Sequence, residues 1–63
     1  MKAAEVKELL KRTGWTLREL GDAISPPMTE RSAFRWTRQG VSRKRISRQL
    51  KKLLEEARRG TAA

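Results

Sequence analysis

Glycine and proline divide this chain into four short segments, and that division limits the fold more than any other feature of the sequence. Gly14 and Gly40 stand where a helix can end in a left-handed residue, and Pro26-Pro27 disfavours the helical conformation just before it. Each segment between these stops carries apolar residues at helical spacing, and none shows the alternation of a β-strand. The sequence therefore predicts an all-α fold of four helices.

Two of these segments begin with a clear capping pattern. Thr16 precedes Glu19 by three residues, which is the spacing of a capping box. Met28 and Thr29 stand in the positions of a hydrophobic staple and a cap before the third segment. The predicted helices cover residues 3–13, 17–24 and 29–39 and, after a cap at Ser42, a stretch of about 18 residues that is roughly 27 Å long.

A chain of 63 residues has room for one small core. It contains no Cys and no His, so neither a disulfide nor a common zinc site can stabilise it, and we expect no metal or cofactor. We predict a single domain over residues 1–60 and a disordered tail over 61–63. Because no apolar run approaches the length of a membrane span or a signal peptide, we expect a cytoplasmic protein associated with the nucleoid.

The positive charge is concentrated in the middle of the chain. The sequence has 16 Lys and Arg against 7 Asp and Glu, a formal net charge of +9. Residues 29–52 hold nine basic side chains and one acidic side chain, which gives that segment a charge of +8. Such an excess favours a polyanionic partner, and an anionic membrane surface or simple solubility is a less favoured explanation.

Three arginines form the most informative pattern within this basic segment. Arg31, Arg35 and Arg38 recur at spacings of four and three, so in a helix they form one stripe. Ala33 and Trp36 fall on the opposite side, where we expect them to pack inward. Such a helix suits the major groove of duplex DNA. We expect Arg31, nearest the helix start, to contact guanine, and Arg35 and Arg38 to contact phosphate.

The fourth segment adds two further expectations. Basic residues cluster at its start, where free backbone N–H groups can also meet a phosphate, and we expect them to hold the DNA backbone without reading its sequence. These residues are Arg43, Lys44, Arg45 and Arg48. The predicted helix is longer than a three-helix core requires, so its last apolar residues are expected to form a homodimer contact. They are Leu53, Leu54 and Ala57.

Two neighbouring segments read Trp15-Thr-Leu-Arg-Glu-Leu-Gly-Asp-Ala-Ile24 and Met28-Thr-Glu-Arg-Ser-Ala-Phe-Arg-Trp36. Together they resemble the helix-turn-helix of the phage-repressor and Cro-like family of small phage or mobile-element regulators. Gly21 stands where that motif needs a small residue between its two helices. The resemblance implies a sequence-specific transcriptional repressor that occupies an inverted-repeat promoter operator as a dimer, with half-sites about 34 Å apart.

The resemblance also implies a role for individual positions. The base-facing set would be Thr29, Glu30, Arg31 and Phe34, with Thr16 and Leu17 near a phosphate and Ala33 as the buried anchor. Glu30 can accept from a cytosine amino group, or it can compensate the positive end of the helix. Phe34 lies at the border between the inward and outward faces, so it can meet a thymine methyl group or complete the core.

Functions of other classes remain open from the sequence. Catalysis is not expected, because the chain lacks His and Cys and shows no spacing of a nucleophile with a base. A small basic phage protein can instead bind an acidic protein partner, as an inhibitor or adaptor, or bind nucleic acid without sequence preference. RNA binding is less favoured, because aromatic residues for stacking on single strands are scarce. Nothing in the sequence indicates a small-molecule ligand.

Overall fold

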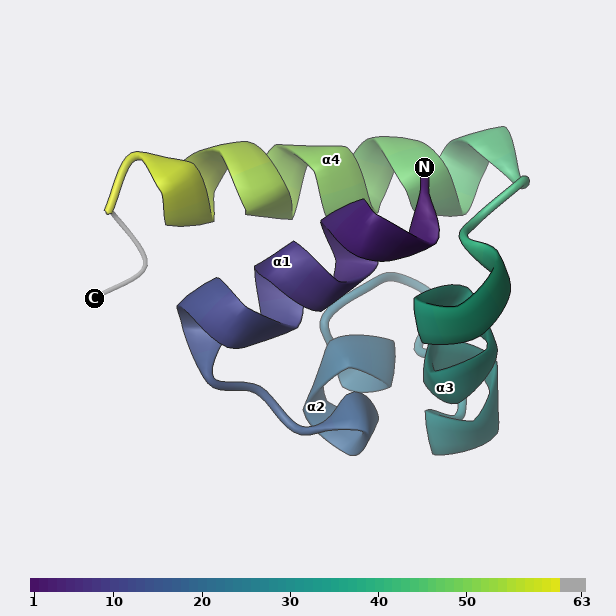
Figure 1. Ribbon diagram of the computed structural model, residues 1–63. Coiled ribbons are helices and arrows are strands. Elements are labelled where there is room, and N and C mark those ends of the chain that lie inside the picture. The colour runs from purple at the N-terminus through teal and green to yellow at the C-terminus, as the bar shows by residue number, and fades with distance from the viewer. Residues whose placement is uncertain (61–63) are drawn as a thin grey trace.

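The computed structural model describes residues 1–60, and within them the all-α prediction is confirmed. The helices are α1 (Ala3–Thr13), α2 (Leu17–Asp22), α3 (Glu30–Gln39) and α4 (Lys44–Arg58). α4 runs along one side of the molecule and α1 packs against it, while α3 packs against both α1 and α2 (Figure 1). This arrangement places α3 at one end of the molecule. The predicted tail at 61–63 lies outside the described residues.

The predicted cap of α2 and the predicted glycine stops of α1 and α3 are confirmed. The Thr16 hydroxyl accepts from the N–H of Glu19 (3.2 Å), and the Glu19 carboxylate accepts from the N–H of Thr16 (2.9 Å), which completes the capping box of α2. Gly14 and Gly40 follow α1 and α3 with φ angles of 74° and 78°. Glycine adopts this region without the steric cost that a side chain brings.

The second helix is shorter than the sequence predicts, because α2 ends at Asp22 and not at residue 24. The N–H of Met28 donates to the carbonyl oxygen of Gly21 (2.8 Å), so the chain has already turned back toward α3. Gln49 of α4 fixes the connection: its amide donates to the carbonyl oxygen of Ser25 (2.9 Å) and accepts from the N–H of Ser25 (2.8 Å). The path between α2 and α3 is therefore held by a distant residue.

The start of the fourth helix also differs from the prediction. Its N-cap residue is Arg43 and not Ser42, and α4 has 15 residues, fewer than expected. The side chain of Val41 is buried, and its N–H donates to the carbonyl oxygen of Met1 (2.7 Å). The N-terminal ammonium of Met1 donates in return to the carbonyl oxygen of Val41 (2.8 Å). This pairing keeps the chain extended past Ser42, so the helix begins later.

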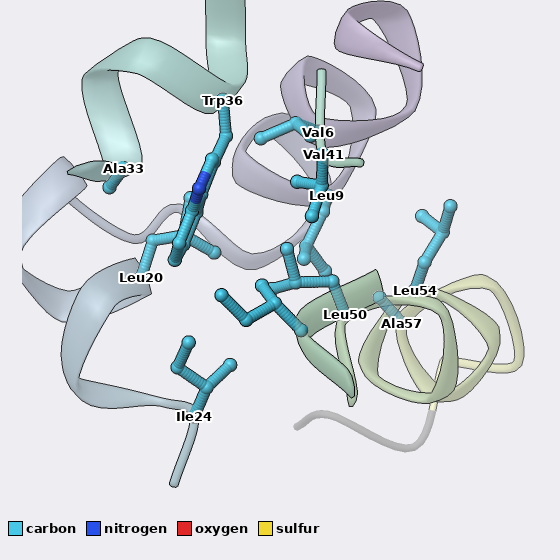
Figure 2. Close-up of a cluster of buried hydrophobic side chains, with 11 residues drawn as sticks. Val6, Leu9, Leu20, Ile24, Ala33, Trp36, Val41, Leu50, Leu54 and Ala57 are labelled. Atoms are coloured by element: carbon cyan, nitrogen blue, oxygen red, sulfur yellow. The ribbon is translucent and has the colours of Figure 1, made fainter. Parts of the chain in front are cut away.

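All four helices contribute to one core (Figure 2). Trp36 extends from α3 toward Leu20 of α2 and is only 6% exposed, and Ala33 of α3 is fully buried. The predicted inward face of α3 is therefore confirmed at both positions. The buried residues are Val6, Leu9, Leu20, Ile24, Ala33, Trp36, Val41, Ile46, Leu50, Leu54 and Ala57.

The core also corrects the expected dimer contact on α4. Leu54 is 2% exposed and Ala57 is 9% exposed, since α1 packs against α4 and both residues belong to the core of the monomer. Leu53 is partly buried against the same core. The prediction that Leu54 and Ala57 are free for a second chain is therefore wrong. The homodimer stays a prediction, and its contact must use other side chains.

Gly21 lies buried where α2 meets the start of α3. A Cβ atom at this position would collide with the carbonyl oxygen of Met28 and would lie 3.1 Å from the carbonyl oxygen of Thr29. Both neighbours are backbone atoms, which cannot swing aside as a side chain can. The absence of a side chain at Gly21 therefore sets how closely α3 approaches α2, in agreement with the sequence prediction of a small residue here.

Glu8 connects α1 to the end of α4 by charged hydrogen bonds. Its carboxylate accepts from Nε and Nη2 of Arg58 (2.8 Å each) and from Nε of Arg12 (2.7 Å). These bonds, that of Arg58 first and that of Arg12 second, lower the pKa of Glu8 from 4.5 to about 2. The charged form of Glu8 is thus favoured in the folded protein.

This arrangement predicts a loss of stability in acid. Because folding lowers the pKa of Glu8, its contribution is fully present above pH 4.5 and is lost as the pH falls from there toward about 2. The Tm of the wild-type protein should therefore fall more steeply across this window than that of Glu8→Gln, which has no carboxyl group to protonate. Circular dichroism melts between pH 7 and pH 2 measure both, and parallel curves would show that the ion pairs of Glu8 add no stability.

Candidate nucleic-acid interface

α3 presents a broad outward face to solvent. Ala33 and Trp36 occupy the buried side of the helix, and the exposed residues occupy about half of its circumference at helical spacing. We call these exposed residues the α3 outward face. They are Glu30, Arg31, Phe34, Arg35, Arg38 and Gln39. The predicted arginine stripe lies along the middle of this face.

The arginines of the stripe are not neutralised by acidic neighbours. Among residues 1–60, no carboxylate lies within ion-pair distance of Arg31, Arg35 or Arg38. Glu30, the acidic residue of the same face, lies in the first turn of α3, where its charge complements the positive end of the helix dipole. The outward face therefore carries an uncompensated positive charge that an anion can neutralise.

Phe34 belongs to the outward face and not to the core. It is 48% exposed, which answers the question that its border position leaves open in the sequence. The guanidinium carbon of Arg38 lies over its ring, 5.6 Å from the ring centroid, which is the geometry of a cation–π contact. An aromatic ring and a cation thus form a contiguous pair on the exposed side of α3.

Three of the predicted contact residues have structural duties. The Thr29 hydroxyl accepts from the N–H of Ser32 and donates to its Oγ, both at 3.1 Å, so this hydroxyl is occupied in capping α3. Thr16 caps α2 in the same way and remains exposed. Leu17 is partly buried and packs against the core. Thr16, Thr29 and Leu17 therefore position the helices, and the exposed Arg and Lys side chains are the groups that can contact an anionic ligand.

The basic residues at the start of α4 are exposed as well. Arg43 is the N-cap residue, and Lys44 and Arg45 occupy the first turn. Arg48 follows one turn later. None of the four has a carboxylate partner among residues 1–60. Only residues 40–43 separate α3 from α4, so this basic group follows directly on the arginine stripe of α3 in the chain.

A hollow of about 340 Å³ lies between α3 and the start of α4. Arg35 of α3 and Arg43 of the α4 cap both line it, together with the polar groups of Gln39 and Ser42. Its apolar lining consists of Met28, Trp36, Val41 and Ile46. The sequence predicts separate phosphate contacts for Arg35 and Arg43, but it gives no sign that they share one hollow, because this depends on the angle between the two helices.

No family model, curated protein or solved structure matches this chain. In the described part of the chain, no helix combines the length and the apolar character needed to span a membrane. The same residues contain no cluster of acidic side chains suited to a metal ion. Function must therefore be inferred from the shape and charge of the surface itself.

Proposed function

We propose that this protein is a transcriptional regulator that binds double-stranded DNA with α3 in the major groove. The uncompensated arginine stripe on the α3 outward face carries the proposal, because the opposite face is anchored in the core by Ala33 and Trp36. An α-helix with its side chains is about 10–12 Å across, and the major groove is about 12 Å wide. Association with the nucleoid would follow from this activity.

The exposed cations divide into two roles within this proposal. Arg31 lies in the first turn of α3, from which reader helices contact bases, and its planar fork matches O6 and N7 of guanine. Arg35 and Arg43 line the same hollow, so they are suited to hold the backbone on either side of one phosphate. Lys44, Arg45 and Arg48 would extend this contact along the backbone in a manner that carries no sequence information.

The regulatory action that we propose is repression by occupancy of a promoter operator. It is supported by the resemblance of the two central segments to phage repressors, which pair on inverted repeats. Pairing of two copies on DNA would have to use surfaces that exclude Leu54 and Ala57, since both are buried in the monomer.

Fluorescence anisotropy with a duplex selected from a random pool tests the proposal, with a random duplex and a single-stranded RNA as controls. We expect the selected duplex to bind at least about 10³-fold more tightly than the random duplex. With four to five phosphates contacted, log K should fall by about 4 for each tenfold rise in salt. Equal affinity for the selected duplex, the random duplex and the RNA would mean that binding is non-specific. A failure to bind any duplex at low salt would instead favour an acidic protein partner.

Single substitutions separate the two proposed roles. Arg31→Ala should cost about 1–3 kcal/mol on the selected duplex and relax the preference at one base pair. Arg45→Ala should weaken binding to all duplexes similarly and reduce the salt slope by about one. Both side chains are exposed, so the folds should be unaffected. Repeating the selection and the salt series with each variant measures the difference, and identical behaviour would contradict the division of roles.

A further inference from the structure

We infer that Phe34 and Arg38 act as one unit that reads a thymine and a guanine in adjacent base pairs. The inference rests on the proposed binding of duplex DNA and extends it to particular bases. It also changes the role of Arg38, which the sequence assigns to a phosphate.

Phe34 is an apolar ring within a cationic surface. It is the large hydrophobic residue that remains exposed in residues 1–60, and helical spacing places it next to Arg31 and Arg38. Its burial against a partner would be favourable, whereas the charged phosphate oxygens offer it nothing apolar to contact. In the major groove, the apolar group that base pairs present is the C5-methyl group of thymine. The ring is therefore suited to a thymine.

Arg38 lies over that ring. Its guanidinium carbon lies 5.6 Å from the ring centroid of Phe34, and no carboxylate of residues 1–60 competes for it. A guanidinium that is stacked before binding loses less conformational freedom when it forms hydrogen bonds. The two parallel donors of such a group match O6 and N7 of guanine, which is the commonest specific contact of arginine with a base.

The spacing of the two groups indicates neighbouring base pairs. Successive base pairs are about 3.4 Å apart along the helix axis, and base pairs two steps apart are separated by about 6.8 Å. A separation of 5.6 Å between ring and guanidinium accommodates one such step together with the lateral offset between a thymine methyl group and a guanine edge. The unit would therefore read a thymine and a guanine in neighbouring base pairs, whether the two bases lie on one strand or on opposite strands.

The hollow beside α4 distinguishes Arg38 from Arg35. Arg35 lines this hollow together with Arg43, where a phosphate would meet two cations. Arg38 is not among the residues that line it, and its contact is with Phe34 on the outward face instead. Two arginines that look equivalent in the sequence thus differ in their surroundings, which favours a phosphate for Arg35 and a base for Arg38.

Base analogues in the selected duplex test the inference. Replacing each thymine in turn by uracil removes only the C5-methyl group, and replacing each guanine by 7-deazaguanine removes only the N7 acceptor. For the wild-type protein we expect about a fourfold loss of affinity at one thymine, the factor for one buried methyl group, and about a tenfold loss at a guanine in the adjacent base pair.

Three variants connect these losses to the two side chains. Phe34→Ala should no longer distinguish thymine from uracil. Phe34→Leu keeps an apolar contact but has no aromatic face, so it should still distinguish thymine from uracil while its response to 7-deazaguanine weakens. Arg38→Ala removes every donor of the guanidinium, so it should no longer respond to 7-deazaguanine. Both positions are exposed, and unchanged melting temperatures would confirm that the variants fold.

The outcomes separate this inference from the proposed function. If Arg38→Ala responds to each 7-deazaguanine as strongly as the wild type does, Arg38 does not contact a guanine N7 and the inference is overturned. Selective duplex binding without a sensitive thymine and guanine in adjacent base pairs would overturn the inference and leave the proposed function standing. Loss of any preference between the selected and random duplexes would overturn the proposed function itself.

Discussion

Replacing Arg31, Arg35 and Arg38 together by glutamine should abolish specific binding to duplex DNA while the protein stays folded. A base contact is worth about 1–3 kcal/mol, and if each of the three side chains contributes at least about 1 kcal/mol, their loss predicts at least about a 10²-fold fall in affinity. The fold should persist, because the three side chains are exposed and have no ion-pair partner among residues 1–60. Anisotropy titrations and thermal melts measure the two quantities separately.

A matched control variant has the same net charge as the triple arginine variant but leaves α3 unchanged. Lys7, Lys11 and Arg59 are exposed on α1 and just beyond α4, and replacing all three by glutamine also lowers the formal charge by three, from +9 to +6. The long-range attraction to DNA falls similarly in both triple variants. We expect the control to retain affinity within about tenfold of the wild type. Equal losses in the two proteins would mean that total charge, and not the α3 outward face, determines binding.

Gly21→Val should have the largest effect on folding. The added side chain collides with the carbonyl oxygen of Met28 and crowds that of Thr29, so α3 must move away from α2. The hydrogen bond from the N–H of Met28 to Gly21 would be lost in that movement. A cost of about 3 kcal/mol is expected for such overpacking, and a domain of this size is stable by only about 3–5 kcal/mol.

Thermal melts followed by circular dichroism measure this effect. A loss of about 3 kcal/mol corresponds to a fall in Tm of roughly 12–24 °C for a domain of this size. Gly14→Asn is the control, because Gly14 has a positive φ of 74° but no atom within 4 Å of an added Cβ, and asparagine tolerates that conformation. The control should lose only a few degrees. Similar melting of the two variants would contradict the close approach of α2 and α3.

Local signals in the sequence predict local structure well in this protein. The bounds of α1 agree with the prediction, because Gly14 ends the helix by its own conformation. The end of α2 and the start of α4 differ, because both depend on residues far away in the chain. Gln49 holds Ser25, and Met1 pairs with Val41, and neither contact leaves a pattern in the residues at the helix boundary.

In the candidate site, too, local sequence predicts some features, and others depend on residues far away in the chain. Helical periodicity is sufficient to predict the buried positions of Ala33 and Trp36, but it cannot decide Phe34, which lies at the border of the two faces. The prediction for Leu54 and Ala57 is wrong because the packing of α1 against α4 depends on tertiary structure.

Methylation protection on the selected duplex tests the central claim, that α3 lies in the major groove, most directly. Dimethyl sulfate modifies N7 of guanine in the major groove and N3 of adenine in the minor groove. At saturating protein we predict protection of guanine N7 within the bound sequence, with one guanine losing its protection in the Arg31→Ala complex. Protection confined to adenine N3, or unchanged methylation on a fully bound duplex, would contradict the claim.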